Sequence, residues 1–125
     1  MREEDKNLLM IDLCSRLPYG VKVEAETWLE DEGEFAYVPD KVYSINSDGY
    51  IVHGYDEVYE CKPYLFPLSS MTEEQKEEFD RLYTYDALII NPQWELIDWL
   101  NKNHFDYRGL IEKGLAIDAT NKKIY

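Results

Sequence analysis

The stretch from Lys62 to Leu82 most constrains the fold, because it changes from extended chain to helix over a short distance. Pro63 and Pro67 hold φ at about −65° and push the residues before them out of the α region. Thr72 then provides a helix N-cap, and Gln75 stands three residues later, as in a capping box. The stretch therefore joins a β-rich first half of the chain to a helical second half.

An amphipathic helix is predicted over residues 3–17, before the β-rich region. Pro18 and Gly20 end it, because proline disfavours the α conformation in the residue before it. Cys14 falls on the apolar stripe and is interpreted as a small core residue rather than a reactive thiol. The stripe consists of apolar residues at helical spacing: Leu9, Met10, Leu13, Cys14 and Leu17.

Strands are predicted next, because the apolar period changes. Val21 to Glu26 alternates apolar and charged residues, which is typical of a strand with one solvated face. An acidic loop follows over residues 30–34, and a returning strand over 35–38 is expected to end at Pro39-Asp40.

Asp48-Gly49 predicts a two-residue β-hairpin, since both central positions of a type I′ turn need positive φ. The corresponding register pairs Ile45 with Val52 and places Val42 on a mixed outer face. The face assigned to the core carries Tyr43, Ile45, Tyr50 and Val52.

The whole chain is predicted to be one α+β domain, 1–125, with a mainly antiparallel sheet of four to six strands against about three helices. The strands lie within 21–66, where 58–66 supplies the last of them, with a further short strand at 115–119. The helices are expected at 3–17, 72–84 and 92–103, the third starting at Asn91-Pro92. Tyr85 to Ile90 either continues a helix or forms an extended link.

Net charge is the one extreme property of the composition. The chain has 13 basic and 26 acidic side chains among 125 residues, and a formal net charge of −13. Such a field repels nucleic acid and anionic membranes and favours a basic protein as partner. The acidity either serves recognition or only keeps the protein soluble. The absence of a signal-peptide pattern and of a disulfide framework favours a cytoplasmic protein.

The sequence assigns no catalytic, cofactor-binding or metal-ligating residue. It contains no Gly-rich phosphate loop, no GxSxG elbow, and no CxxC or HExxH pair. Asp48, His53 and Asp56 either converge near the hairpin as a carboxylate–histidine group or serve the turn and a strand face separately.

Two polar features follow the last predicted helix. His104 is expected at the helix end, where a cation is favoured. Asp106 to Gly109 is interpreted as an Asp–Arg pair that anchors the C-terminal segment, and alternatively as a binding patch.

Three blocks carry a resemblance: Asp12 to Val23; Lys62 to Leu65 with Ser69 to Glu74; and Asp98 to Leu100 with His104 to Ile111. In these blocks the chain resembles a family of small uncharacterised proteins of Bacteroides-type bacteria, often encoded in phage-derived or mobile regions. The resemblance implies a cytoplasmic accessory protein and implies no activity, cofactor or catalytic residue.

The function favoured by the sequence is a non-catalytic protein-interaction module. Glu73, Glu77 and Asp80 share one helix face at steps of roughly 5–6 Å, comparable to successive phosphates on a strand, so they are candidate partner-binding residues. A solvated helix face is the other interpretation. A small carboxylate- or metal-dependent hydrolase and a structural or assembly subunit remain as alternatives, and the sequence leans against an enzyme.

Overall fold

The computed structural model describes residues 2–45, 51–53, 56–58, 61–88 and 94–125. Two short 3₁₀ turns lie at Leu17–Tyr19 and Leu68–Ser70. The helices are α1 (Glu3–Arg16), α2 (Glu73–Leu88) and α3 (Trp94–Lys102). The strands are β1 (Lys22–Leu29), β2 (Glu34–Ile45), β3 (Ile51–His53), β4 (Asp56–Val58), β5 (Lys62–Pro67), β6 (Phe105–Asp106) and β7 (Ile117–Asp118).

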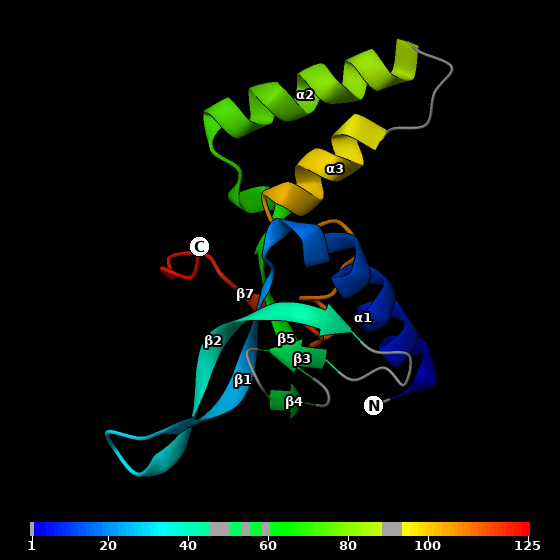
Figure 1. Ribbon diagram of the computed structural model, residues 1–125. Helices are drawn as coiled ribbons and strands as arrows, with labels where there is room; N and C mark the ends of the chain where they lie inside the picture. Colours follow the sequence, from blue (N-terminus) through cyan, green and yellow to red (C-terminus); the bar gives the residue numbers. More distant parts are fainter. Residues whose placement is uncertain (1, 46–50, 54–55, 59–60, 89–93) are drawn as a thin grey trace.

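The sheet is mixed and mostly antiparallel, which confirms the predicted α+β class. Its order is β4-β3-β2-β1-β5-β6, and β7 pairs with β5 beside this path. Among the described strands, only β6 and β7 run parallel to their neighbour, β5. In Figure 1 the α2–α3 pair lies at one end of the molecule and the β1–β2 hairpin extends from the other. None of the helices in the described part of the chain is long and apolar enough to cross a membrane.

The predicted α1 stripe is confirmed at Leu9, Leu13 and Leu17 and is wrong at Cys14. The buried residues are Leu9, Asp12, Leu13 and Arg16, whereas Cys14 is exposed. The helix therefore turns a face that includes a charged pair toward the core. A prediction from hydrophobic periodicity places charged residues in solvent, so it assigned only apolar positions to the buried face.

Strand β2 continues through Pro39, where a break was predicted. Pro39 pairs with Glu24 in the middle of the β1–β2 ladder. Proline can stay in a strand where its missing N–H group is not needed for a ladder hydrogen bond. On the edge of β2 away from β1, β3 pairs only from Val42 onward, so no described strand lies beside Pro39 on that edge. Proline is likewise tolerated at Pro63, which is buried within β5 opposite Val23.

The predicted register of the second hairpin was also wrong. Ile45 pairs with Ile51 rather than Val52, and an irregularity between Val42 and Ser44 inserts Tyr43 as an extra residue. A bulge of this kind reverses which side chains face the core. Val42 is 1% exposed and Tyr43 is 60% exposed, the opposite of the prediction. The Asp48-Gly49 turn and Tyr50 lie outside the described residues.

The predicted start of α2 is confirmed in detail. The Gln75 N–H donates to Thr72 Oγ1 at 3.1 Å, and the Thr72 N–H donates to Gln75 Oε1 at 2.9 Å. These two bonds are the capping box. The helix continues to Leu88, so most of the stretch from Tyr85 to Ile90 continues the helix and is not an extended link. Asn91-Pro92 lies outside the described residues.

Candidate functional site

A buried charge cluster joins α1 to the C-terminal segment. Arg16 donates to both carboxylate oxygens of Asp12, from Nε at 2.8 Å and Nη2 at 3.1 Å, and neither side chain is exposed. Arg16 Nη2 also donates to the Phe105 carbonyl at 2.6 Å. These three bonds and the Arg108 contact described below satisfy most of the pair, while Arg16 Nη1 has no hydrogen-bond partner among the described residues. The cluster thus fixes β6 against α1, and we assign it a structural role.

Arg108 was predicted to pair with Asp106, and this was wrong. Its Nη1 instead donates to Asp12 Oδ1 at 3.1 Å, across 96 positions of sequence. The carboxylate of Asp106 accepts the backbone N–H groups of Leu110 and Ile111, at 3.0 and 2.9 Å. Both residues nevertheless anchor the C-terminal segment, as the structural interpretation expected. The Asp12–Arg16 spacing of four residues was the sequence signal for the cluster, and sequence reasoning missed it.

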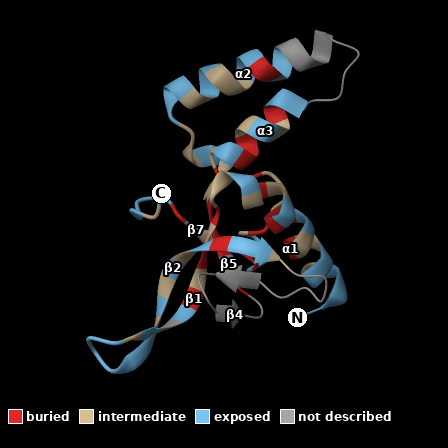
Figure 2. Cartoon of the chain, in the orientation of Figure 1, coloured by how far each residue is buried: buried red, intermediate tan, exposed pale blue. Residues whose placement is uncertain are grey.

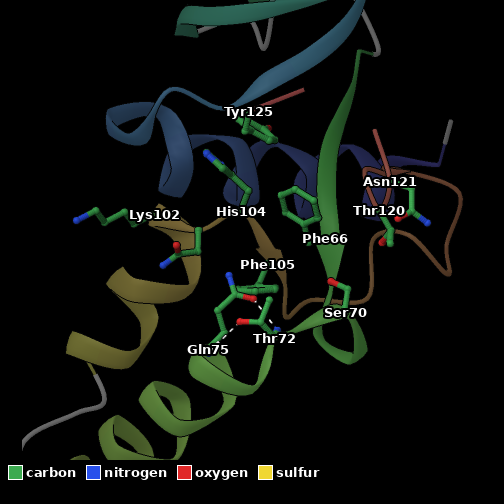
Figure 3. A pocket seen from close by; sticks show the side chains of 11 residues that line it. Phe66, Ser70, Thr72, Gln75, Lys102, His104, Phe105, Thr120, Asn121 and Tyr125 are labelled. Atoms are coloured by element: carbon green, nitrogen blue, oxygen red, sulfur yellow. Dashed lines mark hydrogen bonds between the residues drawn. The ribbon is translucent and has the colours of Figure 1, made fainter. Parts of the chain in front are cut away.

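A cleft of about 500 Å³ lies where the start of α2 meets the end of α3 and the C-terminal segment (Figure 3). None of the described residues that line it is Asp or Glu, and Lys102 is the one lysine or arginine among them. The lining residues are Phe66, Ser70, Thr72, Gln75, Lys102, Asn103, His104, Phe105, Thr120, Asn121 and Tyr125.

His104 is the most unusual residue of this cleft. It has φ of 61° and is 7% exposed, and its ring stacks on Tyr125 with 3.7 Å between centroids. Burial, with the nearby positive charges of Arg16 and Lys22, lowers the pKa of His104 to about 4. His104 lies just after the end of α3, as predicted, but it is neutral at pH 7, so the predicted positive charge is wrong.

Tyr125 is held in place by hydrogen bonds to two strands. Its hydroxyl donates to the Tyr64 carbonyl at 2.7 Å and accepts from the Lys22 N–H at 3.0 Å. Burial is the main cause that raises the pKa of Tyr125 to about 12, so the hydroxyl stays protonated. The aromatic wall that it forms with His104 is consequently rigid and uncharged.

The outer part of the β1–β2 hairpin, residues 26–37, forms an arm that projects from the sheet, and it is largely exposed (Figure 2). The strand register places Trp28 opposite Phe35 and Glu26 opposite Tyr37, on one face. The Trp28 and Phe35 rings meet edge to face, 4.9 Å between centroids. Phe35 and Tyr37 are 62% and 69% exposed. The arm therefore presents three aromatic side chains to solvent on a single face.

The arm is also strongly acidic. The sequence has no lysine or arginine between Val23 and Asp40. Within the described part of the chain, none of the arm's exposed carboxylates forms an ion pair. These carboxylates belong to Glu26, Glu30, Asp31, Glu32 and Glu34.

The predicted partner-binding residues Glu73, Glu77 and Asp80 are all exposed on α2. Cations are interspersed with them, unlike on the arm. Lys76 Nζ lies 3.6 Å from a Glu73 oxygen, and Arg81 makes a 2.6 Å contact with Glu78 whose hydrogen bonding lowers the pKa of that carboxyl. Binding by this face stays a prediction.

The predicted carboxylate–histidine group is only partly within the described residues. His53 and Asp56 are directly paired between β3 and β4, while Asp48 lies outside the described part. Among the described residues, no group of three or more His, Cys, Asp and Glu side chains is placed to hold a metal ion. The described residues therefore add no metal ligand to the His53–Asp56 pair on which the hydrolase alternative depends.

Comparison of the chain with protein-family models, with curated proteins and with solved structures gives no match.

Proposed function

We propose that the protein is a non-catalytic interaction module that binds an arginine-rich basic segment of a partner protein through the arm. Such a role agrees with the accessory protein that the resemblance implies. The observation that carries the proposal is the exposed aromatic face of Trp28, Phe35 and Tyr37, in a segment, residues 24–39, that has many carboxylates and no lysine or arginine.

This combination suits the guanidinium group better than other ligands. Arginine stacks on aromatic faces and pairs with carboxylates through its planar fork, whereas lysine is a compact, strongly hydrated charge. Each exposed cation–π contact contributes about 0.5–1 kcal/mol. Three rings with five carboxylates therefore favour a segment with several arginines over an isolated one.

The arm supports this function better than α2 does. On α2, Lys76 and Arg81 already neutralise part of the acidic face. A basic partner would have to compete with these internal cations, whereas the arm carboxylates have no such competitors among the described residues. Electrostatic steering should be correspondingly stronger toward the arm.

Fluorescence anisotropy with a labelled peptide of alternating Arg and Gly tests the proposal. We expect saturable binding that weakens as salt rises from about 50 to about 300 mM, because exposed charges are screened. The matched lysine peptide should bind less tightly, because lysine stacks less well on aromatic rings.

Two double variants separate the surfaces. Trp28→Ala with Phe35→Ala should weaken arginine-peptide binding, and Glu73→Gln with Glu77→Gln should leave it nearly unchanged. Loss of binding only in the α2 variant would move the interaction to α2. Binding that ignores salt, or no binding, would reject the proposal.

A further inference from the structure

We propose that the cleft at His104 is a binding site for a small planar aromatic compound that carries one negative charge. This site is separate from the arm and does not depend on the arm's function. It would give the protein a small-molecule ligand in addition to a protein partner.

The charge of the lining selects for an anion. The chain holds 26 acidic side chains, yet no described residue that lines the cleft is Asp or Glu. Lys102 supplies the positive charge, and residues 101–125 hold five basic and three acidic side chains, in contrast to the acidic remainder of the chain. A single lysine matches a single carboxylate better than a doubly charged phosphate, because the protein's overall field opposes further negative charge.

Backbone strain concentrates at the same place. His104 and Asn121 are the two non-glycine residues with positive φ in the described part of the chain, and both line the cleft. Asparagine tolerates positive φ, so the conformational cost falls on His104, and conformations of this kind gather at functional sites. Among the described side chains, His104 Nδ1 and Arg16 Nη1 are buried without a hydrogen-bond partner, and of these two atoms His104 Nδ1 belongs to a residue of the cleft.

Aromatic side chains supply the apolar surface of the cleft. Phe66 and Tyr125 contact each other, with 6.0 Å between ring centroids and an interplanar angle of 51°, and His104 stacks on Tyr125 (Figure 3), so a planar ligand would pack against the outside of this cluster and not between its rings. The side-chain amides of Gln75 and Asn103 also line the cleft and each keep an N–H group that can donate to a carboxylate, whereas the Ser70 hydroxyl donates to the Pro67 carbonyl. The volume of about 500 Å³ lies within the usual range of small-molecule sites.

Benzoate, benzamide and benzamidine test the proposal, because they share one ring and carry charges of −1, 0 and +1 at neutral pH. Each is titrated into the ¹⁵N-labelled full chain to about 10 mM, a range that detects millimolar affinities. We expect saturable shifts of the His104, Asn121 and Tyr125 amides with benzoate, and at least about tenfold weaker binding of benzamidine.

Lys102→Gln should weaken benzoate binding about three- to tenfold and leave benzamide binding unchanged, since only the anion loses a partner. Lys113→Gln, an exposed lysine of the same segment outside the cleft, is the matched control and should change neither. Inorganic phosphate should not shift these amides, because it offers no ring.

Three results would overturn the proposal. The first is no saturable shift at the cleft amides with any ring compound. The second is benzamidine or phosphate binding there as tightly as benzoate. The third is a Lys102→Gln variant that binds benzoate as well as the natural chain does.

Discussion

The carboxylates near the C-terminal segment and those of the arm are the same chemical group, but they differ in burial and in bonding partners. Asp12 and Asp106 are buried, and each accepts several hydrogen bonds from fixed donors. The arm carboxylates, such as Glu30 and Glu32, are exposed and form no ion pair among the described residues. Net charge alone therefore does not say what an acidic residue does, because one set holds the fold and the other faces potential partners.

Replacing a buried carboxylate should have the largest effect. Asp12→Asn would leave Arg16 buried without its counter-charge and would also release Arg108. We expect a loss of about 3–5 kcal/mol in the free energy of unfolding, measured by urea denaturation. Glu32→Gln on the arm is the control and should change stability by less than about 0.5 kcal/mol. A loss at Asp12 no larger than that control would contradict the structural role.

Acidification should destabilise the fold through His104. The pKa of His104 is about 4 in the folded chain, below its ordinary value of 6.5, so the unfolded chain binds a proton first as pH falls. Stability contributed by neutral His104 is fully present above pH 6.5 and declines toward pH 4, by up to about 3 kcal/mol.

The variant His104→Asn isolates this pH effect, because asparagine tolerates positive φ and does not titrate. The difference in unfolding free energy between the natural chain and the variant should shrink as pH falls from 7 to 4.5. A difference that stays constant over this range would show that His104 is not held neutral.

Removing the arm aromatics should affect binding more than folding. Trp28→Ala with Phe35→Ala removes the edge-to-face pair, at a cost of about 0.5–1.5 kcal/mol of stability. The same double variant should bind the arginine peptide about tenfold less tightly, since two cation–π contacts are lost. A stability loss above about 3 kcal/mol with unchanged binding would make these rings structural instead.

Neutralising the arm carboxylates should have the smallest effect on stability. Glu30→Gln, Asp31→Asn and Glu32→Gln together should change the unfolding free energy by no more than about 0.5 kcal/mol, because exposed charges contribute little. The same triple variant should flatten the salt dependence of peptide binding, since salt then screens fewer attractive contacts. Unchanged salt dependence would place the attraction elsewhere.

Local signals in the sequence predicted local structure well. The capping box at Thr72 and Gln75, the acidic loop after β1 and the strand near Ile117 are all present. Each depends on residues close together in the chain, so propensity and turn chemistry suffice to find it. The fold class follows from the same signals.

The errors arose where distant residues decide the outcome. The contact between Asp12 and Arg108 joins residues 96 positions apart, and no local pattern predicts it. The bulge at Tyr43 depends on how β3 docks. The cleft likewise combines parts of β5, α2, α3 and the C-terminal segment. The sequence therefore singled out His104 but could not predict that it lines a cleft.

A map of backbone amide shifts during titration with the arginine peptide tests the central claim most directly. The account predicts that the largest shifts fall on residues 26–37 at low salt and disappear in the Trp28→Ala, Phe35→Ala variant. Shifts centred on α2, or shifts on the arm that survive the loss of both rings, would contradict it.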